Sequence, residues 1–255
     1  MRELIKKIIE SILPKKWLLS LRYVYQKTTN KTDEEMFYVS QILKRKRRFL
    51  DIGANVGIYS YHFKNTFEKI DAFEPLSEIT YRLEFYQNEF LKIHNIALSN
   101  KVGEFQLYIP LIDKKIVPPL ASLEKRDSNC EVRTVRVNTL DSYNFDDVDL
   151  IKIDVEGHEH QVIEGGIKTI KKNMPIMIIE IEQRHIKNRI DEVFRYITSL
   201  NYSGFFLNKG ELISLNEFSY EVNQKPYLDM VEASEYINNF IFIPNDKVNE
   251  ILVGL

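Results

Sequence analysis

The sequence predicts an α/β protein in which parallel strands form a central sheet and helices cover both of its faces. Short apolar runs of strand length alternate with longer segments of helical period. Three of the apolar runs close on an acidic residue, namely Asp51, Glu74 and Asp154. An alternation of strand and helix indicates parallel βαβ units with right-handed crossovers, and this order fixes the fold class.

The composition indicates a soluble globular protein. The chain has 255 residues, enough for one large domain with a full core. Its hydrophobic content is 44% and its charged content 28%, both ordinary values. No apolar run of about 18 residues occurs, and lysines interrupt the N-terminal segment, so neither a membrane span nor a signal peptide is expected. Because Cys130 is the single cysteine, no intramolecular disulfide can form, and we expect a cytoplasmic protein.

Charge is unevenly distributed along the chain. Residues 1–48 contain 13 Lys and Arg against 5 Asp and Glu, although the whole chain has a formal net charge of −2. Residues 1–31 are interpreted as an amphipathic helical arm, with an apolar helical face over residues 3–13 that ends at Pro14. The arm is expected to pack on the main domain or on a second subunit, with weak membrane-surface binding as the alternative. The rest of the chain is acidic, so no nucleic-acid partner is expected.

The main domain, residues 32–255, contains the remaining elements in order. Thr32 caps a helix that reaches about Lys44, where five consecutive basic residues suit the negative end of the helix dipole. Strands are expected at residues 49–51, 70–74, 94–99, 105–109, 132–137, 149–154, 174–181 and 239–243, with a hairpin at 202–208 and 211–215. Helices are expected at residues 58–66, 78–90, 160–172 and 190–200. Residues 110–130 are interpreted as a long, irregular insertion.

The turn after the first strand has the sequence Asp-Ile-Gly-Ala-Asn-Val-Gly over residues 51–57. Gly53 has no Cβ, so backbone can approach a ligand there, and Gly57 lets the next helix start close to the strand. The spacing differs from the Gly-x-Gly-x-x-Gly of dinucleotide-binding enzymes. The turn therefore predicts a site for a nucleotide-like ligand and disfavours a nicotinamide-dependent oxidoreductase.

The acidic strand ends are expected to meet at this turn. Ligands of open α/β sheets bind beyond the carboxyl ends of the strands, near the point where the strand order reverses. Glu74 lies 23 positions after Asp51, close to the ~20-residue gap at which a second acid reaches a ribose hydroxyl in the dinucleotide folds. A carboxylate can accept hydrogen bonds from both hydroxyls of a ribose diol, so Glu74 is a candidate ribose-binding residue.

Five segments together resemble the FkbM-type family of S-adenosylmethionine-dependent methyltransferases. They are Asp-Ile-Gly-Ala-Asn-Val-Gly at 51–57, Phe-Glu-Pro at 73–75, Asn-Ile-Ala-Leu-Ser at 95–99, Val-Asn-Thr-Leu-Asp at 137–141 and Ile-Asp-Val-Glu-Gly-His-Glu at 153–159. The similarity covers about residues 32–245 and leaves the arm outside. The glycine turn marks only the broad class I superfamily, whereas the Asp-Val-Glu-Gly-x-Glu segment with its upstream Thr-Leu-Asp is more specific.

The resemblance implies a class I Rossmann-like methyltransferase with a seven-stranded, mostly parallel sheet whose last strand is antiparallel. It implies that S-adenosylmethionine is bound at the first turn, with Glu74 on the ribose, residues 95–97 near the adenine and Asp154 near the methionine end. It also implies O-methylation, often of sugars. The expected cofactor-binding residues are Asp51, Gly53, Asn55, Gly57, Glu74, Pro75, Asn95, Ala97 and Asp154.

Methyl transfer to an alcohol is helped by a base, because the acceptor oxygen must lose its proton. The candidate catalytic residues are Glu156, His158, Glu182 and His185, and Glu159 is a candidate for substrate binding. Asp154, Glu156 and one of Glu180 or Glu182 offer hard oxygen ligands for a divalent metal such as Mg²⁺. Spacing along the sequence does not establish that these oxygens converge, so no metal site is predicted.

Residues 111–129 are expected to form part of the acceptor site. Ser122 lies in an Ala-Ser-Leu element that resembles a recurring family segment, and Lys125 and Arg126 supply positive charge that suits a nucleotide-linked sugar. The leading hypothesis is O-methylation of a sugar hydroxyl, on a nucleotide-linked sugar or a bacterial surface glycan precursor. The alternatives are a nucleic-acid methyltransferase that uses the basic arm and a cofactor-binding scaffold without chemistry. The Asn/Asp-Pro-Pro-Tyr/Phe motif of amino-group methylators is absent, and the acids of the fourth strand are intact.

Overall fold

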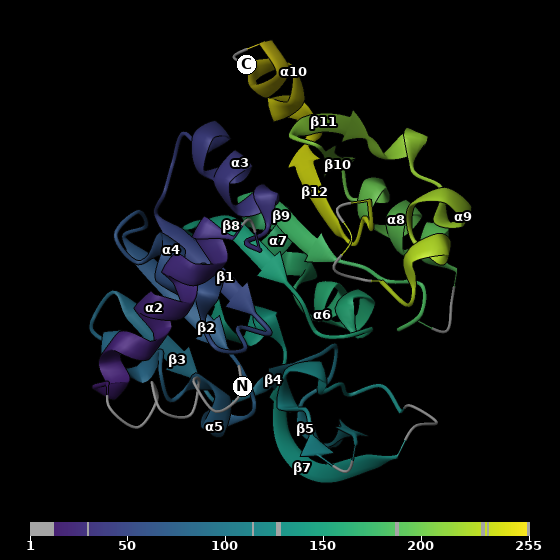
Figure 1. Ribbon diagram of the computed structural model, residues 1–255. Helices are drawn as coiled ribbons and strands as arrows, with labels where there is room; N and C mark the ends of the chain where they lie inside the picture. The colour runs from purple at the N-terminus through teal and green to yellow at the C-terminus, as the bar shows by residue number, and fades with distance from the viewer. Residues whose placement is uncertain are drawn as a thin grey trace.

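A computed structural model describes residues 13–29, 31–113, 115–125, 129–186, 189–230, 233 and 235–253. Its centre is an eight-stranded sheet in the order β11-β10-β12-β9-β8-β1-β2-β3 (Figure 1). In that order the strands are β11 (Glu211–Ser214), β10 (Tyr202–Asn208), β12 (Asn239–Pro244), β9 (Ile176–Glu180), β8 (Val148–Ile153), β1 (Arg48–Ile52), β2 (Lys69–Phe73) and β3 (Leu91–His94).

The strand directions confirm the predicted fold class. β1 pairs in parallel with β2 and with β8, β2 pairs in parallel with β3, and β8 pairs in parallel with β9. The last strand, β12, runs antiparallel to β9. The sheet has eight strands where seven were expected, because the hairpin strand β11 pairs with β10 and extends that edge by one strand.

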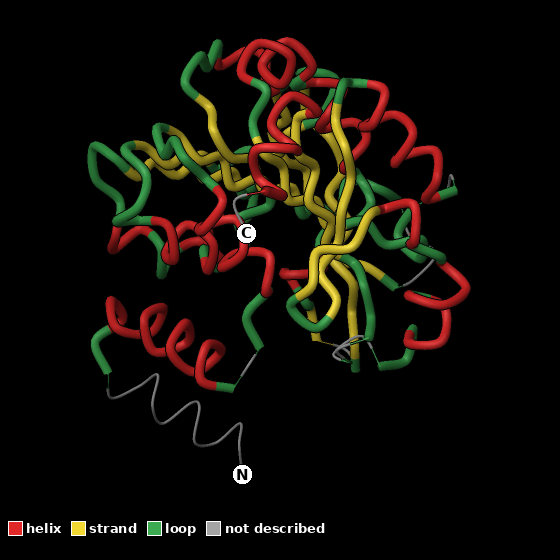
Figure 2. The backbone as a smooth tube through the Cα atoms, turned by 90° about the horizontal axis from the view of Figure 1, so that it is seen from above, coloured by secondary structure: helices red, strands yellow, loops and turns green. Residues whose placement is uncertain are grey.

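Helices cover both faces of the sheet, as Figure 2 shows from above. One face packs against α2 (Lys15–Thr28), α3 (Glu34–Ile42), α4 (Ile58–Phe63) and α10 (Asn245–Val253), and the other against α6 (Glu159–Gly165), α7 (Ile167–Asn173) and α8 (Ile190–Ser199). The α3–α4 core contains Met36 and Phe63, and the opposite core contains Val162 and Ile197. Strands buried on both faces explain the nearly continuous apolar runs in the sequence.

A smaller sheet in the order β4-β7-β5-β6 forms a separate lobe in Figure 1. Its strands are β4 (Ala97–Leu98), β7 (Cys130–Asn138), β5 (Gly103–Ile112) and β6 (Lys115–Ile116). The expected insertion at residues 110–130 is therefore partly ordered: it contains β6, the 3₁₀ helix η2 (Pro118–Leu120) and a bridge between Tyr108 and Ser122. This bridge holds the segment against β5 of the smaller sheet.

Several expected elements differ from the structure, each for a local reason. The helix expected at 78–90 is wrong: only α5 (Ser77–Thr80) and the 3₁₀ helix η1 (Glu84–Tyr86) form, and the Asn88 side chain then accepts the backbone N–H groups of Phe90 and Leu91 in a turn. The strand expected at 94–99 divides into β3 and β4, which belong to different sheets. The helix expected at 160–172 breaks after Gly165, where a Cβ would lie 1.9 Å from the Ser99 carbonyl oxygen.

The remaining elements are short and lie outside the site. They are the 3₁₀ helices η3 (Leu140–Tyr143), η4 (Leu215–Glu217) and η5 (Lys225–Tyr227) and the helix α9 (Tyr220–Asn223). The helix α10 was not among the expected elements.

The described half of the N-terminal arm packs on the main domain. Leu18 and Leu19 of α2 are buried, the Tyr23 hydroxyl lies 2.7 Å from His62 Nδ1 on α4, and the Tyr86 hydroxyl donates to the Lys16 carbonyl. The apolar face expected at residues 3–13 lies, apart from residue 13, outside the described residues. Among the helices that are described, none combines the length and the apolar composition needed to cross a membrane.

Candidate active site

The carboxyl ends of β1, β2 and β8 meet at the glycine turn. The Gly53 N–H donates to the Phe73 carbonyl at 2.9 Å, and the Asp154 N–H donates to the Ile52 carbonyl at 2.9 Å. Gly53 has a φ of +75°, and a Cβ built on it would lie 1.7 Å from the Asp154 carbonyl oxygen. Only glycine fits between these two strand ends, since it both tolerates positive φ and leaves this space.

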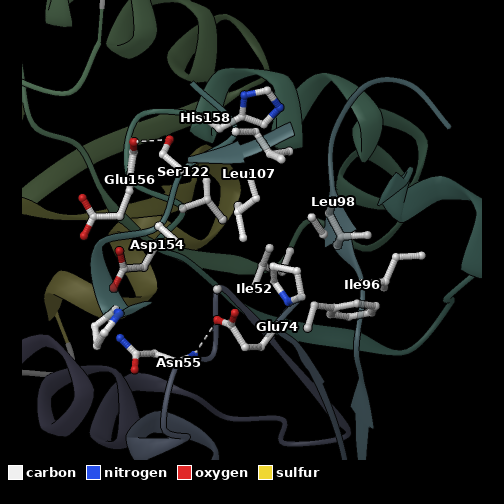
Figure 3. Close-up of a pocket in the computed structure, with 18 of the residues that line it drawn as sticks. Ile52, Asn55, Glu74, Ile96, Leu98, Leu107, Ser122, Asp154, Glu156 and His158 are labelled. Carbon is white, nitrogen blue, oxygen red and sulfur yellow. Dashed lines mark hydrogen bonds between the residues drawn. The ribbon is translucent and has the colours of Figure 1, made fainter. Parts of the chain in front are cut away.

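A pocket opens in front of this turn, and we call it the glycine-turn pocket (Figure 3). Its apolar wall includes Ile52, Phe73, Ile96, Leu98 and Leu107, and residues of the insertion, among them Pro118 and Leu123, close another side. Its polar residues are Asn55, Glu74, Ser122, Asp154, Glu156 and His158. The arrangement offers an apolar surface for a flat ring beside carboxyl groups for hydroxyls.

Glu74 is held in the pocket by backbone hydrogen bonds. One carboxyl oxygen accepts the Asn55 N–H at 3.1 Å and the other accepts the Leu76 N–H at 3.1 Å. Burial raises the pKa of Glu74 to about 7, because the charged form loses its hydration. The carboxyl is therefore fixed in orientation before any ligand binds.

The other expected cofactor residues divide into two groups. Gly53, Asn55, Pro75, Ala97 and Asp154 line the glycine-turn pocket together with Glu74. Asp51, Gly57 and Asn95 do not line it. The Asp51 carboxylate accepts the backbone N–H and the hydroxyl of Ser60 at the start of α4. Gly57 has a φ of +86° and packs against Leu83, and Asn95 donates a long, 3.4 Å hydrogen bond to the Glu74 carbonyl.

A buried lysine that sequence reasoning missed lies behind the pocket. Lys152, near the carboxyl end of β8, is 2% exposed, and its ammonium donates to Asn239 Oδ1 at 2.9 Å and lies 3.8 Å from Glu180 Oε2. Burial lowers the pKa of Lys152, but Asp154 and Glu180 outweigh it and hold the pKa above its usual value. Burial raises the pKa values of Asp154 and Glu180. A charge inside an apolar strand sequence was the signal that could have identified Lys152.

The structure brings two of the four candidate bases together. Glu156 Oε2 lies 3.0 Å from His185 Nδ1, and each side chain is 12% exposed. Glu156 lines the glycine-turn pocket. Gly157 makes this pairing sterically feasible, because a Cβ there would lie 2.3 Å from the His185 carbonyl oxygen. A carboxylate hydrogen-bonded to an imidazole fixes the orientation of the ring.

The remaining two candidate bases, and Glu159, have structural partners. The His158 ring nitrogens lie 2.8 Å from Ser99 Oγ and 2.8 Å from Glu124 Oε1, so both are engaged. Glu159 accepts the Gly157 N–H at 2.9 Å at the start of α6. Burial acts to raise the pKa of Glu182, but hydrogen bonds from Arg184 and Tyr236 hold it below its usual value.

The expected acceptor-binding residues of the insertion are not gathered in one place. Ser122 is buried and donates to the Glu156 carbonyl at 2.7 Å, so it anchors the insertion to the loop after β8. Lys125 is exposed and lines none of the pockets described here, and Arg126 lies outside the described residues. Within the described ranges, no group of three or more His, Cys, Asp or Glu residues is arranged to hold a metal ion.

The strand order, the antiparallel last strand and the glycine turn at the point where the order reverses define the class I methyltransferase fold. The sequence profile of the methyltransferase FkbM domain matches residues 51–203, and the chain belongs to this family. No curated protein gave a significant match in a sequence search.

Several solved structures are similar to the chain at low sequence identity. The methyltransferase FkbM from Methylobacillus flagellatus KT is 15% identical, with a TM-score of 0.50 over 77% of this chain and 43% of that one, so the chain spans less than half of that protein. An rRNA methylase from Streptococcus thermophilus is 10% identical, with a TM-score of 0.44 over 82% of this chain and 91% of that one. A TehB-like SAM-dependent methyltransferase from Corynebacterium glutamicum is 10% identical, with a TM-score of 0.45 over 90% of this chain and 97% of that one.

The raised pKa of Glu74 predicts a pH-dependent effect of the Glu74→Gln substitution. In the wild type, the buried Glu74 carboxyl is more easily kept protonated in the folded state than in the unfolded state. The stability that this contributes is fully present below a pH of about 4.5 and is lost as the pH rises through about 7. The glutamine does not titrate, so the variant should gain stability relative to the wild type from pH 5 to pH 8. Between pH 5 and pH 8, the free energy of unfolding of the variant should rise relative to that of the wild type by on the order of 1–3 kcal/mol. Urea unfolding at both pH values measures it, and parallel pH profiles would contradict the assignment.

Proposed function

We propose that this protein is an S-adenosylmethionine-dependent O-methyltransferase that methylates a hydroxyl of a sugar, either nucleotide-linked or part of a bacterial surface glycan precursor. Membership of the FkbM family supports methyl transfer. The observation that supports an oxygen acceptor is the Glu156–His185 pair, at 3.0 Å, at the edge of the glycine-turn pocket. An alcohol must lose a proton as it is methylated, and this pair is suited to accept one.

The residues of the glycine-turn pocket fit the methyl donor. Glu74 offers two fixed carboxyl oxygens to a ribose diol, and Ile96 and Leu98 offer an apolar surface to an adenine ring. Gly53 and Asp154 are in close contact, so the methionine part of the donor would lie against backbone atoms rather than a side chain at Gly53. When bound, S-adenosylmethionine supplies a methyl group activated by the sulfonium. No pyrophosphate has to be held, which agrees with the glycine spacing of residues 51–57.

Positioning and deprotonation are the contributions that the protein makes to the reaction. Displacement of the sulfur by the acceptor oxygen is in line, so orienting the acceptor supplies most of the rate advantage. As the new C–O bond forms and the S–C bond breaks, the proton of the acceptor hydroxyl passes to the Glu156–His185 pair. Each side chain is only 12% exposed, which limits the access of water that would compete for that proton.

A screen of acceptors tests the proposed function. Purified protein is incubated with S-adenosylmethionine and a panel of free hexoses and of UDP-, GDP- and dTDP-linked hexoses, and products are analysed by mass spectrometry. We expect at least one hexose to gain one methyl group. If S-adenosylhomocysteine binds and no hexose is methylated, the proposed sugar acceptor is refuted.

The assignment of the Glu156–His185 pair predicts separate effects on turnover and on cofactor binding. In Glu156→Gln and His185→Ala, we expect kcat to fall by roughly 10²–10⁴-fold, the usual contribution of a general base. The dissociation constant of S-adenosylhomocysteine should change little, because binding does not require proton transfer. Steady-state kinetics and calorimetry measure the two quantities.

His160→Ala is the control, because His160 is a half-exposed histidine on α6, close in sequence to Glu156 and packed on Tyr196. Its kcat should remain near that of the wild type. Wild-type kcat in both variants of the pair would exclude the pair as the base.

A further inference from the structure

A second and larger cavity lies beside the active site, bounded by the start of α3, the end of β9 and the start of β12. We call it the α3 cavity; its volume is about 490 Å³, and its lining includes Asp33, Glu35, Glu180, Tyr236, Asn238 and Asn239. A narrower hollow of about 170 Å³ shares Thr32 and Asp33 with the α3 cavity and shares Gly53, Asn55 and Asp154 with the glycine-turn pocket. The three spaces therefore follow one another along the carboxyl ends of the strands.

Glu35 is the observation that indicates a ligand in the α3 cavity. It lies in the first turn of α3 and is 8% exposed, it lines the α3 cavity, and its carboxyl accepts a hydrogen bond from its own backbone N–H. Burial raises its pKa to about 8. One hydrogen bond leaves most of the acceptor capacity of this buried carboxyl unused, and a ligand hydroxyl in the cavity would offset part of its desolvation cost.

The other polar groups of the α3 cavity are held in place by hydrogen bonds of their own. Asp33 accepts the Tyr59 hydroxyl at 2.8 Å, Glu180 accepts the Asn238 amide at 2.8 Å, and Asn239 accepts the Lys152 ammonium at 2.9 Å. Each carboxyl or amide group has further hydrogen-bonding capacity beyond these contacts. Groups fixed in this way bind a ligand with little loss of conformational entropy.

The composition of the α3 cavity selects the chemical class of its ligand. Carboxyl and amide groups such as Asp33, Glu35 and Asn238 suit a molecule with several neighbouring hydroxyls, each of which can donate and accept. The four acids of the lining outnumber its two lysines, Lys31 and Lys209, so a phosphate would meet net repulsion. An apolar ligand would leave the buried polar groups unpaired. The chemistry therefore favours an uncharged, polyhydroxylated ring.

We propose that the α3 cavity binds the sugar ring of the acceptor, with the Glu35 carboxyl hydrogen-bonded to its hydroxyls. This inference rests on the proposed function and locates its acceptor site. The residues come from α3, β9 and β12 rather than from the insertion at residues 110–130. Lys125, expected from the sequence to contact the acceptor, lines none of the three spaces.

The test uses whichever hexose or nucleotide-linked hexose of the acceptor panel is turned over fastest. In Glu35→Leu, the apolar side chain cannot hydrogen-bond the acceptor, and we expect the acceptor KM to rise roughly ten- to a hundredfold. The dissociation constant of S-adenosylhomocysteine should stay the same, and this also shows that the variant is folded. Ala233→Phe, which narrows the α3 cavity without removing a polar group, should raise the acceptor KM as well.

Glu192→Leu is the matched control, because Glu192 lies in the first turn of α8 and is exposed on the other side of the sheet. Its acceptor KM should remain that of the wild type. An unchanged KM in both Glu35→Leu and Ala233→Phe, or a raised KM in Lys125→Ala alone, would overturn the cavity assignment and leave the proposed function standing. If S-adenosylhomocysteine binds but no hexose is methylated, the sugar acceptor fails and the cavity assignment fails with it.

Discussion

The contact between Gly53 and Asp154 is the constraint on which the rest of the site depends. A Cβ on Gly53 would lie 1.7 Å from the Asp154 carbonyl oxygen, so the turn after β1 and the exit of β8 can meet only through a glycine. Their parallel pairing then places both acidic strand ends at one edge of the sheet. Glu74 joins them because β2 pairs with the other side of β1. One close backbone contact thereby brings the three acidic strand ends to one edge, where the Glu74 and Asp154 side chains line the glycine-turn pocket.

Lys152 makes this concentration of half-buried acids tolerable. Asp154 and Glu180 are both half-buried, and desolvation raises the pKa of each, so a nearby cation lowers the cost of ionising them. The Lys152 ammonium, fixed by Asn239, provides that charge from the same face of β8 as Asp154, two residues away. The lysine therefore has two roles. It stabilises the charged forms of Asp154 and Glu180, and it fixes the Asn239 side chain that lines the α3 cavity.

Much of the fold and part of the site were predictable from the sequence. Strand-length apolar runs and acidic strand ends have local signatures, so β1, β2, β8 and the glycine turn were identified correctly. The expected helix at 78–90 failed because the side chain of Asn88 forms a turn with the next backbone N–H groups, which helical periodicity does not reveal.

The roles of individual side chains were harder to predict, because they depend on contacts between distant segments. His158 is engaged by Ser99 and Glu124, and Glu182 by Tyr236, far away in sequence. The sequence of residues 153–159 gives no sign that both ring nitrogens of His158 have partners. It therefore could not separate His158 from a catalytic base. Glu35 shows the converse: its sequence context is that of an ordinary acid in the first turn of a helix, and only its burial beside a cavity marks it.

Calorimetric titration of the purified protein with S-adenosylhomocysteine and, separately, with NAD tests the central claim most directly. The geometry of the glycine turn and Glu74 predicts saturable binding of one S-adenosylhomocysteine per chain and no comparable binding of NAD, whose pyrophosphate has no glycine-rich cradle here. An absence of S-adenosylhomocysteine binding, or tighter binding of NAD, would contradict the assignment of the pocket to a methyl donor.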